Sequence, residues 1–454
     1  MRTNRFNRLP WTLAAFVLCG GLSARAQNIQ TLSVDEVVSM SLANNHDLKA
    51  TRHGSEISIA ADHEVRGALL PSVSASGSYT RLSDIPSFEL TLPAEFASLG
   101  DFSVPSIRNR YDFSVRVDQP LFSGGRLLNQ KRSAGLLADA SVESVNAAEA
   151  EVAYAARAAY WNVYQAEASL EVSEAAQRSV EAQLAATITR REQGAALRSD
   201  VLTVQARLGE VKLDVLEARN AVKVAHLKLN EIVGLPMDDE IHTIESAPLD
   251  WSNLDPASLT QTALDDDPSV QAARLNADAL DASARAERAG WLPQIGIVAI
   301  YQYARPNQYI FPLEDTFKGT WQAGLSATWQ LWNWGQTKGR YDQARARAAQ
   351  ANERLVSEER STQFAVREAV MNVEHARLAT SVAEQNVRRA ESSFAEVKRR
   401  MDLGAAVTAE VLDAELADRT ARLREVQARV RYQIALAALW RELGITNTPQ
   451  EPNR

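Results

Sequence analysis

Two stretches of the chain, 190–202 and 400–412, repeat each other at a fixed distance. Their sequences are RREQGAALRSDVL and RMDLGAAVTAEVL, and the numbers of Gly194 and Gly404 differ by 210 (404 − 194). In each stretch the glycine interrupts a long run of helix-forming residues, and glycine adopts the left-handed conformation in which many helices end. Each stretch therefore predicts the tip of a helical hairpin. The chain is a duplication, and we expect the two tips to control its function.

Long helices are expected on both sides of each tip. Residues from about 127 to 192 and from about 338 to 402 predict two helices of ~65 residues, each ~100 Å long. Ser199 and Thr408 are the expected N-caps of the helices that return from the tips. In the first returning helix the apolar residues step by three and four, which is typical of a coiled-coil seam. The seam comprises Val201, Val204, Leu208, Val211, Val215, Ala218, Val222, Ala225, Leu229 and Ile232.

A second match, Pro71 with Pro293, has a different spacing, because these numbers differ by 222 (293 − 71). The change from 222 to 210 predicts a loop about 12 residues longer in the first copy, between Pro71 and Leu121, because long insertions are found at loop tips. We place the first repeat at 27–236 and the second at 257–446. An acidic connector over 237–256 joins them, and 447–454 is a polar tail.

Each repeat also contains two segments in which apolar and polar residues alternate. They predict strands at about 71–80, 111–120, 293–303 and 320–331. The length is near the ~9–11 residues with which a tilted strand crosses a bilayer, although alternation fits an ordinary antiparallel sheet equally well. Aromatic residues near the strand ends favour a membrane barrel. Four strands cannot close a barrel, since ~8 is about the smallest closed size, so these strands require partners.

The segment 1–26 has the pattern of a secretory signal peptide. Arginines precede an apolar run, and Ala24 and Ala26 supply small residues for cleavage. Removal of Arg2, Arg5, Arg8 and Arg25 takes the formal net charge from −8 to −12, which argues against nucleic acid as a partner. The chain's one cysteine also lies in this segment, so a disulfide scaffold and a cysteine–metal site are excluded from the mature chain.

No catalytic constellation emerges from the sequence. The six histidines are scattered, and His63 lacks the second histidine of a zinc-protease helix. No glycine-rich phosphate loop is present, because Gly124 and Gly125 are better explained by a sharp corner between a strand and a helix. We therefore expect no enzyme activity, no cofactor and no metal.

Three acidic residues follow the tips: Asp200 after the first, and Glu410 and Asp413 after the second. Acids near a helix N-terminus can simply complement the helix dipole. If three chains assemble, however, each acidic position becomes a ring of three carboxylates, and such rings favour cations at a constriction. Both interpretations stay open at this point.

Taken together, these features resemble the TolC-type outer-membrane channel family. The resemblance covers the Leu-Pro strand entries, the corner Pro-Leu-Phe-Ser-Gly-Gly-Arg at 120–126, the glycine-centred tips and the closing Leu-Gly of each repeat. It implies a mostly helical α+β fold, built from a duplicated helix–strand–strand–helix–helix unit. In the family, a homotrimer forms a twelve-stranded transmembrane β-barrel, with four strands per chain, above a long helical coiled-coil barrel.

The resemblance also implies partners and site residues. A periplasmic adaptor (a membrane fusion protein) would dock at the Arg-x-x-x-Gly tips, here Arg190 with Gly194 and Arg400 with Gly404. An inner-membrane transporter would supply energy, and outer-membrane lipid would surround the strands. The expected location is the outer membrane, with the helices extending into the periplasm of a Gram-negative-type envelope.

The family's gate residues map onto the acidic positions. Glu410 and Asp413 stand where the family has acids that ring the entrance, and Ser199 and Asp200 stand at the first-tip partners.

This chain departs from the family pattern at two other gate positions. Ala406 replaces a gate arginine, and Met401 replaces a tyrosine. Our hypothesis is that Arg198, or the tip of a neighbouring chain, supplies the missing cation, because buried acids require pairing.

The sequence thus predicts an exit duct of a tripartite efflux pump or a type I secretion system, which passes small molecules or proteins passively. The alternative is a periplasmic coiled-coil adaptor or scaffold with a small soluble β domain. Cell fractionation separates the two, because only the duct should be extracted from the membrane by detergent. The exported substrate and the identity of the pump partners are not encoded in any motif of this chain.

Overall fold

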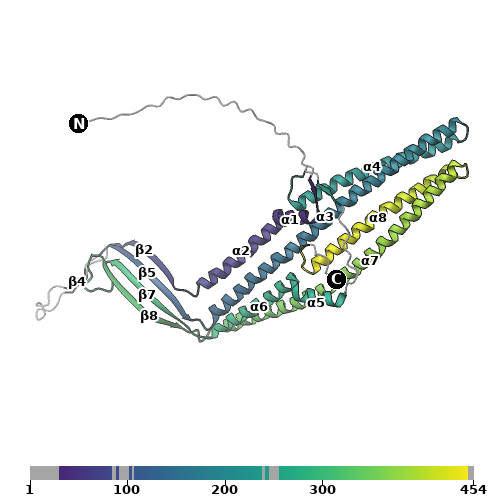
Figure 1. The fold of residues 1–454 in the computed structure, drawn as a ribbon. Coiled ribbons are helices and arrows are strands. Elements are labelled where there is room, and N and C mark those ends of the chain that lie inside the picture. Colours follow the sequence, from purple (N-terminus) through teal and green to yellow (C-terminus); the bar gives the residue numbers. More distant parts are fainter. Residues whose placement is uncertain are drawn as a thin grey trace, which may run out of the picture.

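The computed structural model describes the polypeptide as a long rod with a β-sheet at one end and two helical tips at the other (Figure 1). Residues 30–83, 88–90, 102–104, 107–237, 241–244 and 255–447 are described. The expected signal peptide at 1–26 and residues 448–454 of the tail lie outside these ranges. No helix among the described residues is both long enough and apolar enough to cross a membrane.

The rod consists mainly of two helical hairpins, each made of one long and one short helix. The long arms are α3 (Arg126–Glu192) and α7 (Gln336–Asp402), which both contain 67 residues, and they agree with the expected helices to within two residues at each end. The short arms are α4 (Arg198–Val233) and α8 (Thr408–Glu442). Both long arms begin next to the sheet and end at the tips, so the two tips lie at the same far end of the rod (Figure 1).

The glycines of the tips have the expected left-handed conformation. Gly194 has a φ of +75° and Gly404 a φ of +73°. The residue after each glycine then closes the turn, since the backbone N–H of Ala195 donates to the carbonyl of Arg190 and that of Ala405 donates to the carbonyl of Arg400, both at 2.7 Å.

The expected N-caps of the returning helices are wrong. Leu197 is the N-cap of α4 and Val407 is that of α8, and neither has a side chain that can accept a hydrogen bond. The turn is shorter than we expected, so Thr408 is already the first residue of its helix. At the first tip Asp200 compensates from within the helix, because its Oδ2 accepts the backbone N–H of Leu197 at 2.9 Å.

The helix that opens each repeat is interrupted after about three turns. In the first repeat α1 (Val34–Asn44) is followed by α2 (His46–Gly67), and the Oδ1 of Asn45 caps α2 by accepting the backbone N–H of Leu48 at 2.9 Å. In the second repeat α5 (Pro256–Asp266) and α6 (Pro268–Arg288) are separated in the same way. These shorter helices pack along the sheet-proximal half of α3 and α7 (Figure 1).

A four-stranded antiparallel sheet lies at the other end of the rod. Its strands are β2 (Ser72–Arg81), β5 (Asn109–Phe122), β7 (Gln294–Arg305) and β8 (Lys318–Thr328), in the order β2-β5-β7-β8. Two strands thus come from each repeat, and the outer edges of β2 and β8 have no strand partner among the described residues. The last strand ends at Thr328, before the expected 331.

Two further pairs of short strands were not expected. β1 (Gln30–Leu32) pairs in parallel with β6 (Ile241–Thr243), which lies in the segment assigned to the connector. β3 (Phe88–Leu90) pairs with β4 (Phe102–Val104) in the longer loop of the first repeat.

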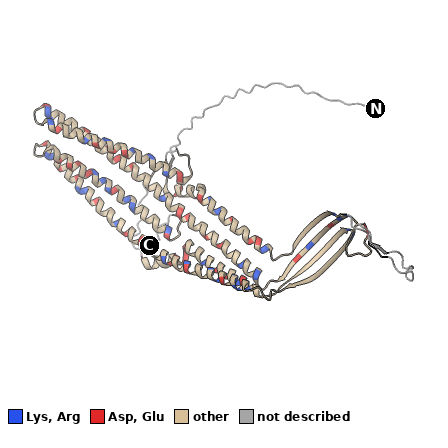
Figure 2. Cartoon of the chain, turned by 180° about the vertical axis from the view of Figure 1, so that it is seen from behind, with Lys and Arg blue, Asp and Glu red and all other residues tan. Residues whose placement is uncertain are grey.

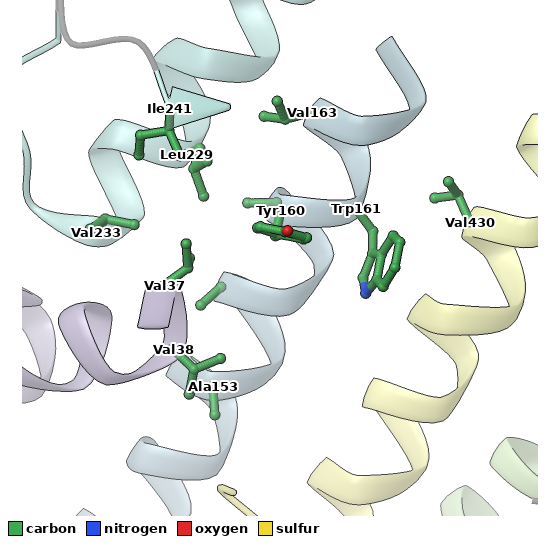
Figure 3. Packing of buried hydrophobic residues seen from close by; sticks show 12 residues of the cluster. Val37, Val38, Ala153, Tyr160, Trp161, Val163, Leu229, Val233, Ile241 and Val430 are labelled. Atoms are coloured by element: carbon green, nitrogen blue, oxygen red, sulfur yellow. The ribbon is translucent and has the colours of Figure 1, made fainter. Parts of the chain in front are cut away.

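The apolar core lies where α1, α3, α4, α8 and β6 meet (Figure 3). Tyr160 is fully buried in it, and its hydroxyl lies 2.8 Å from both the N–H and the carbonyl of Ile244 and 3.1 Å from the carbonyl of Leu32. The tyrosine therefore ties the short β1–β6 pair to the long helix α3. Burial raises the pKa of this phenol, which keeps the hydroxyl protonated and able to donate.

Candidate functional site

The four-stranded sheet has one apolar face. Residues opposite each other in an antiparallel pair point to the same face, and the register places Val73 opposite Val117 and Tyr301 opposite Trp321. The apolar face comprises Val73, Ala75, Tyr79, Tyr111, Phe113, Val115, Val117, Ile295, Ile297, Ala299, Tyr301, Tyr303, Trp321, Ala323, Leu325 and Ala327.

This apolar face is open rather than packed against other elements. Trp321 is 78% exposed, Leu325 74% and Phe113 51%. An exposed apolar surface that extends across four strands marks an interaction with a partner or a membrane. The charged residues are concentrated on the helices, and the sheet is mostly uncharged (Figure 2).

The opposite face of the sheet is largely polar. Ser76 and Ser114 share a hydrogen bond of 2.8 Å across β2 and β5, and Arg116 forms an ion pair with Asp118 at 2.7 Å. The amide of Gln302 on β7 donates to the carboxylate of Asp112 on β5. Val298 and Ile300 are apolar exceptions on this face. A sheet with one apolar and one polar face can separate lipid from water.

Ion pairs hold the tips at the opposite end of the rod. Arg190, at the end of α3, lies 3.2 Å from Asp402, at the end of α7. Arg400 lies 3.4 Å from Glu410 and also donates to the carbonyl of Ala405 at 2.9 Å. The first pair joins the two hairpins, and the second braces the turn of its own hairpin.

The pairing involves two residues for which the sequence suggests different roles. Arg400 was expected at an adaptor-docking surface and Glu410 at a gate, yet the structure brings them together. Asp402 was missed, because nothing in the sequence indicates that the ends of α3 and α7 meet. Gly194 and Gly404 lie at the turns, where a Cβ would meet no atom within 4 Å.

The remaining candidate residues lie near the tips without forming one cluster. Arg198 has no carboxylate within 4.0 Å among the described residues, so the structure of one chain does not join it to the acids of α8. Ser199 lies in the first turn of α4, and Asp200 is occupied by the cap of that helix. Asp413 lines a groove of about 1150 Å³ between α7 and α8, together with Leu416 and Arg424.

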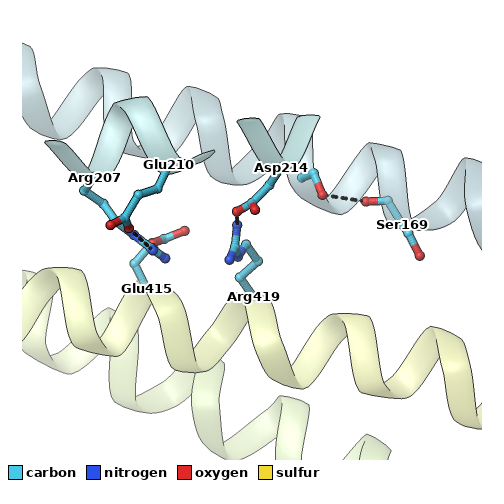
Figure 4. A network of polar contacts seen from close by, with 7 residues as sticks. Ser169, Arg207, Glu210, Asp214, Glu415 and Arg419 are labelled. Atoms are coloured by element: carbon cyan, nitrogen blue, oxygen red, sulfur yellow. Dashed lines mark hydrogen bonds and ion pairs between the residues drawn. The ribbon is translucent and has the colours of Figure 1, made fainter. Parts of the chain in front are cut away.

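A partly buried network joins the two hairpins a few turns behind the tips (Figure 4). Arg207 of α4 contacts Glu415 of α8 at 3.5 Å and Glu210 of its own helix at 3.0 Å. Nearby, Arg419 of α8 pairs with Asp214 of α4. Burial is the largest influence on the pKa of Glu415 and raises it, while the two arginines act in the opposite direction. No motif in the sequence indicates this network, because its two halves come from different repeats, far apart along the chain.

Among the described residues, no group of three or more His, Cys, Asp or Glu side chains is arranged to hold a metal ion.

Comparisons with known proteins agree with this geometry. A family model described as "Outer membrane efflux protein" matches residues 37–235 and 259–444. The alkaline protease secretion protein AprF of Pseudomonas aeruginosa is 24% identical over 352 residues, which cover 75% of this chain and 71% of AprF. The outer membrane efflux protein BepC of Brucella suis biovar 1 is 22% identical over 444 residues, which cover 98% of this chain and 92% of BepC.

The fold is also similar to solved structures. The Campylobacter jejuni CmeC outer membrane channel superposes with a TM-score of 0.77 at 16% identity, covering 97% of this chain and 94% of that one. This likeness concerns the fold, and it includes both the sheet and the helical rod.

Proposed function

The chain belongs to the outer membrane efflux protein family, and from this premise we propose that three copies of it form a continuous duct across the outer membrane and into the periplasm. The chain is an outer-membrane channel that serves efflux or type I secretion. Such proteins work with further efflux or secretion components. The members of this family are channels, so the proposal gives the chain no catalytic role.

The observation that carries the proposal is the sheet with one exposed apolar face, one polar face and two edges that the described residues leave unpaired. Four strands are too few to enclose a pore, whereas three copies supply twelve strands, which is within the range of closed membrane barrels. The apolar face then contacts lipid and the polar face lines the pore. The outer edges of β2 and β8 pair between neighbouring chains and disappear.

The helices supply the periplasmic part of the duct. A helix of 67 residues is about 100 Å long, and its tip lies at the end of the rod farthest from the sheet (Figure 1). We propose that a periplasmic adaptor docks there, at Arg190 and Gly194 and at Arg400 and Gly404. An inner-membrane transporter would complete the assembly and provide the energy.

We further propose that the acids behind the tips form the entrance. In a trimer Glu410 and Asp413 become rings of three carboxylates, which attract cations and repel one another when unpaired. In each chain Glu410 lies 3.4 Å from Arg400, and we propose that this pair keeps the entrance narrow. Arg198 would reach the acids of a neighbouring chain. It would thereby replace the gate arginine of the family, whose position is occupied by Ala406 in this chain. Ser199 and Asp200 would lie beside this contact.

The proposal is tested by inserting the purified mature protein into a planar lipid bilayer. Discrete conductance steps support a duct, and their absence in a correctly folded preparation contradicts it. The alternative, a periplasmic adaptor or scaffold, predicts that the protein is released from the periplasm without detergent. A duct stays in the outer-membrane fraction until detergent is added.

A further inference from the structure

The internal duplication extends to the hydrogen-bonded register of the sheet. Gly125 and Gly335 cap α3 and α7, and their numbers differ by 210 (335 − 125). Asn45 and Asp267 cap α2 and α6, and their numbers differ by 222 (267 − 45). The strand leading into each long helix, β5 or β8, therefore follows the spacing of 210. The strand that follows each shorter helix, β2 or β7, follows the spacing of 222.

The pairing of β2 with β5 and that of β7 with β8 allow these two spacings to be checked against the observed register. In the first repeat Ser72 of β2 lies opposite Asp118 of β5. Adding 222 to the first number and 210 to the second gives Gln294 and Thr328, and these residues are opposite each other in β7 and β8. The far end of the pair agrees as well, because Arg81 with Asn109 becomes Tyr303 with Gly319. The duplication thus preserves strand register without any slip.

The pair that joins the two repeats, β5 with β7, has no second example among the described residues of one chain. By the same spacings its counterpart is β8 paired with β2, and these are the two outer edges of the sheet. They cannot meet in one chain, because two strands lie between them and three strand spacings of about 4.8 Å separate them by roughly 14 Å. A second copy of the chain supplies the missing partner.

We propose that β8 of one chain pairs with β2 of the next in the register of β5 with β7, a refinement that rests on the proposed trimeric duct. The pair Asp118–Val298 within one chain corresponds to Thr328 of one chain opposite Ser76 of the next. In the same way, Arg116–Ile300 corresponds to Ser326 opposite Ser78 of the next chain. Gln119 opposite Ile297 becomes Trp329 opposite Ala75. The partner is thus a second copy of this chain, held by a specific set of residue pairs.

The chemistry of both edges agrees with this register. Thr328, Ser326, Ser76 and Ser78 are all on the polar face, so hydroxyl-bearing side chains oppose one another. On the apolar face Val115 opposite Tyr301 becomes Leu325 opposite Tyr79. A slip by one residue would place the apolar residues of one chain on the polar face of the next, because side chains alternate with a period of two.

The same register explains why β8 ends early. β5 continues past Asp118 because Gln119, Pro120 and Phe122 pair with β7. The counterparts in the second repeat, Trp329, Gln330 and Trp332, have no such strand neighbour among the described residues, and Trp329 is 58% and Trp332 74% exposed. Residues 73–75 of the next chain are the partners that this register assigns to them.

Cysteine cross-linking tests the register directly. The chain's one cysteine, Cys19, lies in the expected signal peptide, so introduced cysteines are the only thiols of the mature protein. Opposite residues of an antiparallel pair have Cα atoms about 4.5–5.5 Å apart, which a disulfide spans, whereas residues two positions away are about 7–8 Å apart, which it does not. All the positions used carry small polar side chains, so the substitutions are mild.

Thr328→Cys is combined in turn with Ser74→Cys, Ser76→Cys and Ser78→Cys, and outer membranes are oxidised before electrophoresis without reductant. The expected result is a ladder of dimers and trimers that is several-fold stronger with Ser76→Cys than with the other two. Ser326→Cys with Ser78→Cys should give the same ladder. This second pair keeps the test valid if one of the other variants folds poorly. Single-cysteine variants set the background.

The outcomes separate the register from the duct. A maximum at Ser74→Cys or Ser78→Cys overturns the register, as does the absence of cross-links in a preparation whose mass is that of a trimer. In both cases the trimeric duct itself stands. A protein that is monomeric in detergent overturns both proposals.

Discussion

Arg207 of α4 and Glu415 of α8 form an ion pair of 3.5 Å across the two hairpins, and their side chains are only 14% and 5% exposed. The pair lies behind the tips, where it is shielded from the solvent that surrounds the turns. A charged contact in this place joins the hairpins only while both partners are present, because removal of one leaves the other buried and unpaired.

The stability conferred by Glu415 should depend on pH. Burial raises the pKa of Glu415 in the folded state above the ordinary value of 4.5, so the folded protein binds this proton more tightly than the unfolded chain does. The group therefore favours folding at low pH, and that contribution is lost as the pH rises through the raised pKa. We expect the melting temperature of the native protein, relative to Glu415→Gln, to fall between pH 4.5 and neutral pH. A difference that is constant or rises with pH would contradict the buried environment of Glu415.

The hydroxyl of Tyr160 should stabilise the short β1–β6 pair. In Tyr160→Phe the backbone N–H of Ile244 loses its acceptor at 2.8 Å, while the ring still fills the core. We expect a loss of about 1–2 kcal/mol in the free energy of unfolding. Hydrogen exchange should increase at residues 30–32 and 241–244 and stay unchanged at the tips. Unchanged exchange in these segments would show that the hydroxyl does not hold them.

Two glycines with the same left-handed conformation should differ in their tolerance of alanine. Gly194 has open space around it, so Gly194→Ala should cost only about 1–2 kcal/mol of backbone strain. At Gly124, with a φ of +64°, an added Cβ would lie 2.8 Å from the Cβ of Leu292 and 3.1 Å from the carbonyl of Ala289. Gly124→Ala should therefore cost about 1–3 kcal/mol more, because a packed corner must shift. Thermal unfolding in detergent measures both, and equal costs would argue against the close packing at this corner.

The proposed entrance should respond to charge. Glu410→Ala and Asp413→Ala should reduce cation selectivity, measured as a shift of the reversal potential towards zero in a bilayer with a salt gradient. Arg400→Ala should raise the conductance if the pair with Glu410 holds a closed arrangement. Arg198→Ala should do the same if Arg198 reaches the acids of a neighbouring chain. Should Arg198→Ala leave the conductance unchanged while the acidic variants alter it, the proposed role of Arg198 fails.

The helical part of the fold was predictable because its signals are local. Gly194 and Gly404 mark the turns, because glycine adopts the left-handed conformation that each turn requires. The exact N-caps were wrong because Ser199 and Thr408 have suitable side chains but the turn ends before them. Local propensity indicates that a helix starts, and the path of the turn decides at which residue.

The missed features all depend on contacts between distant residues. The network of Arg207 and Glu415 requires two hairpins to lie side by side, which no spacing in the sequence encodes. β1 and β6 have three residues each, too few for any alternation to be recognised. The end of β8 was placed at residue 331 from its alternating pattern, whereas one chain provides pairing only as far as Thr328.

The mass of the detergent-extracted complex tests the central claim most directly. The mature protein is extracted from outer membranes and measured by native mass spectrometry. We expect an assembly with three times the mass of one chain, in which twelve strands close the barrel of the proposed duct. A mature chain that is monomeric and freely soluble without detergent would contradict it.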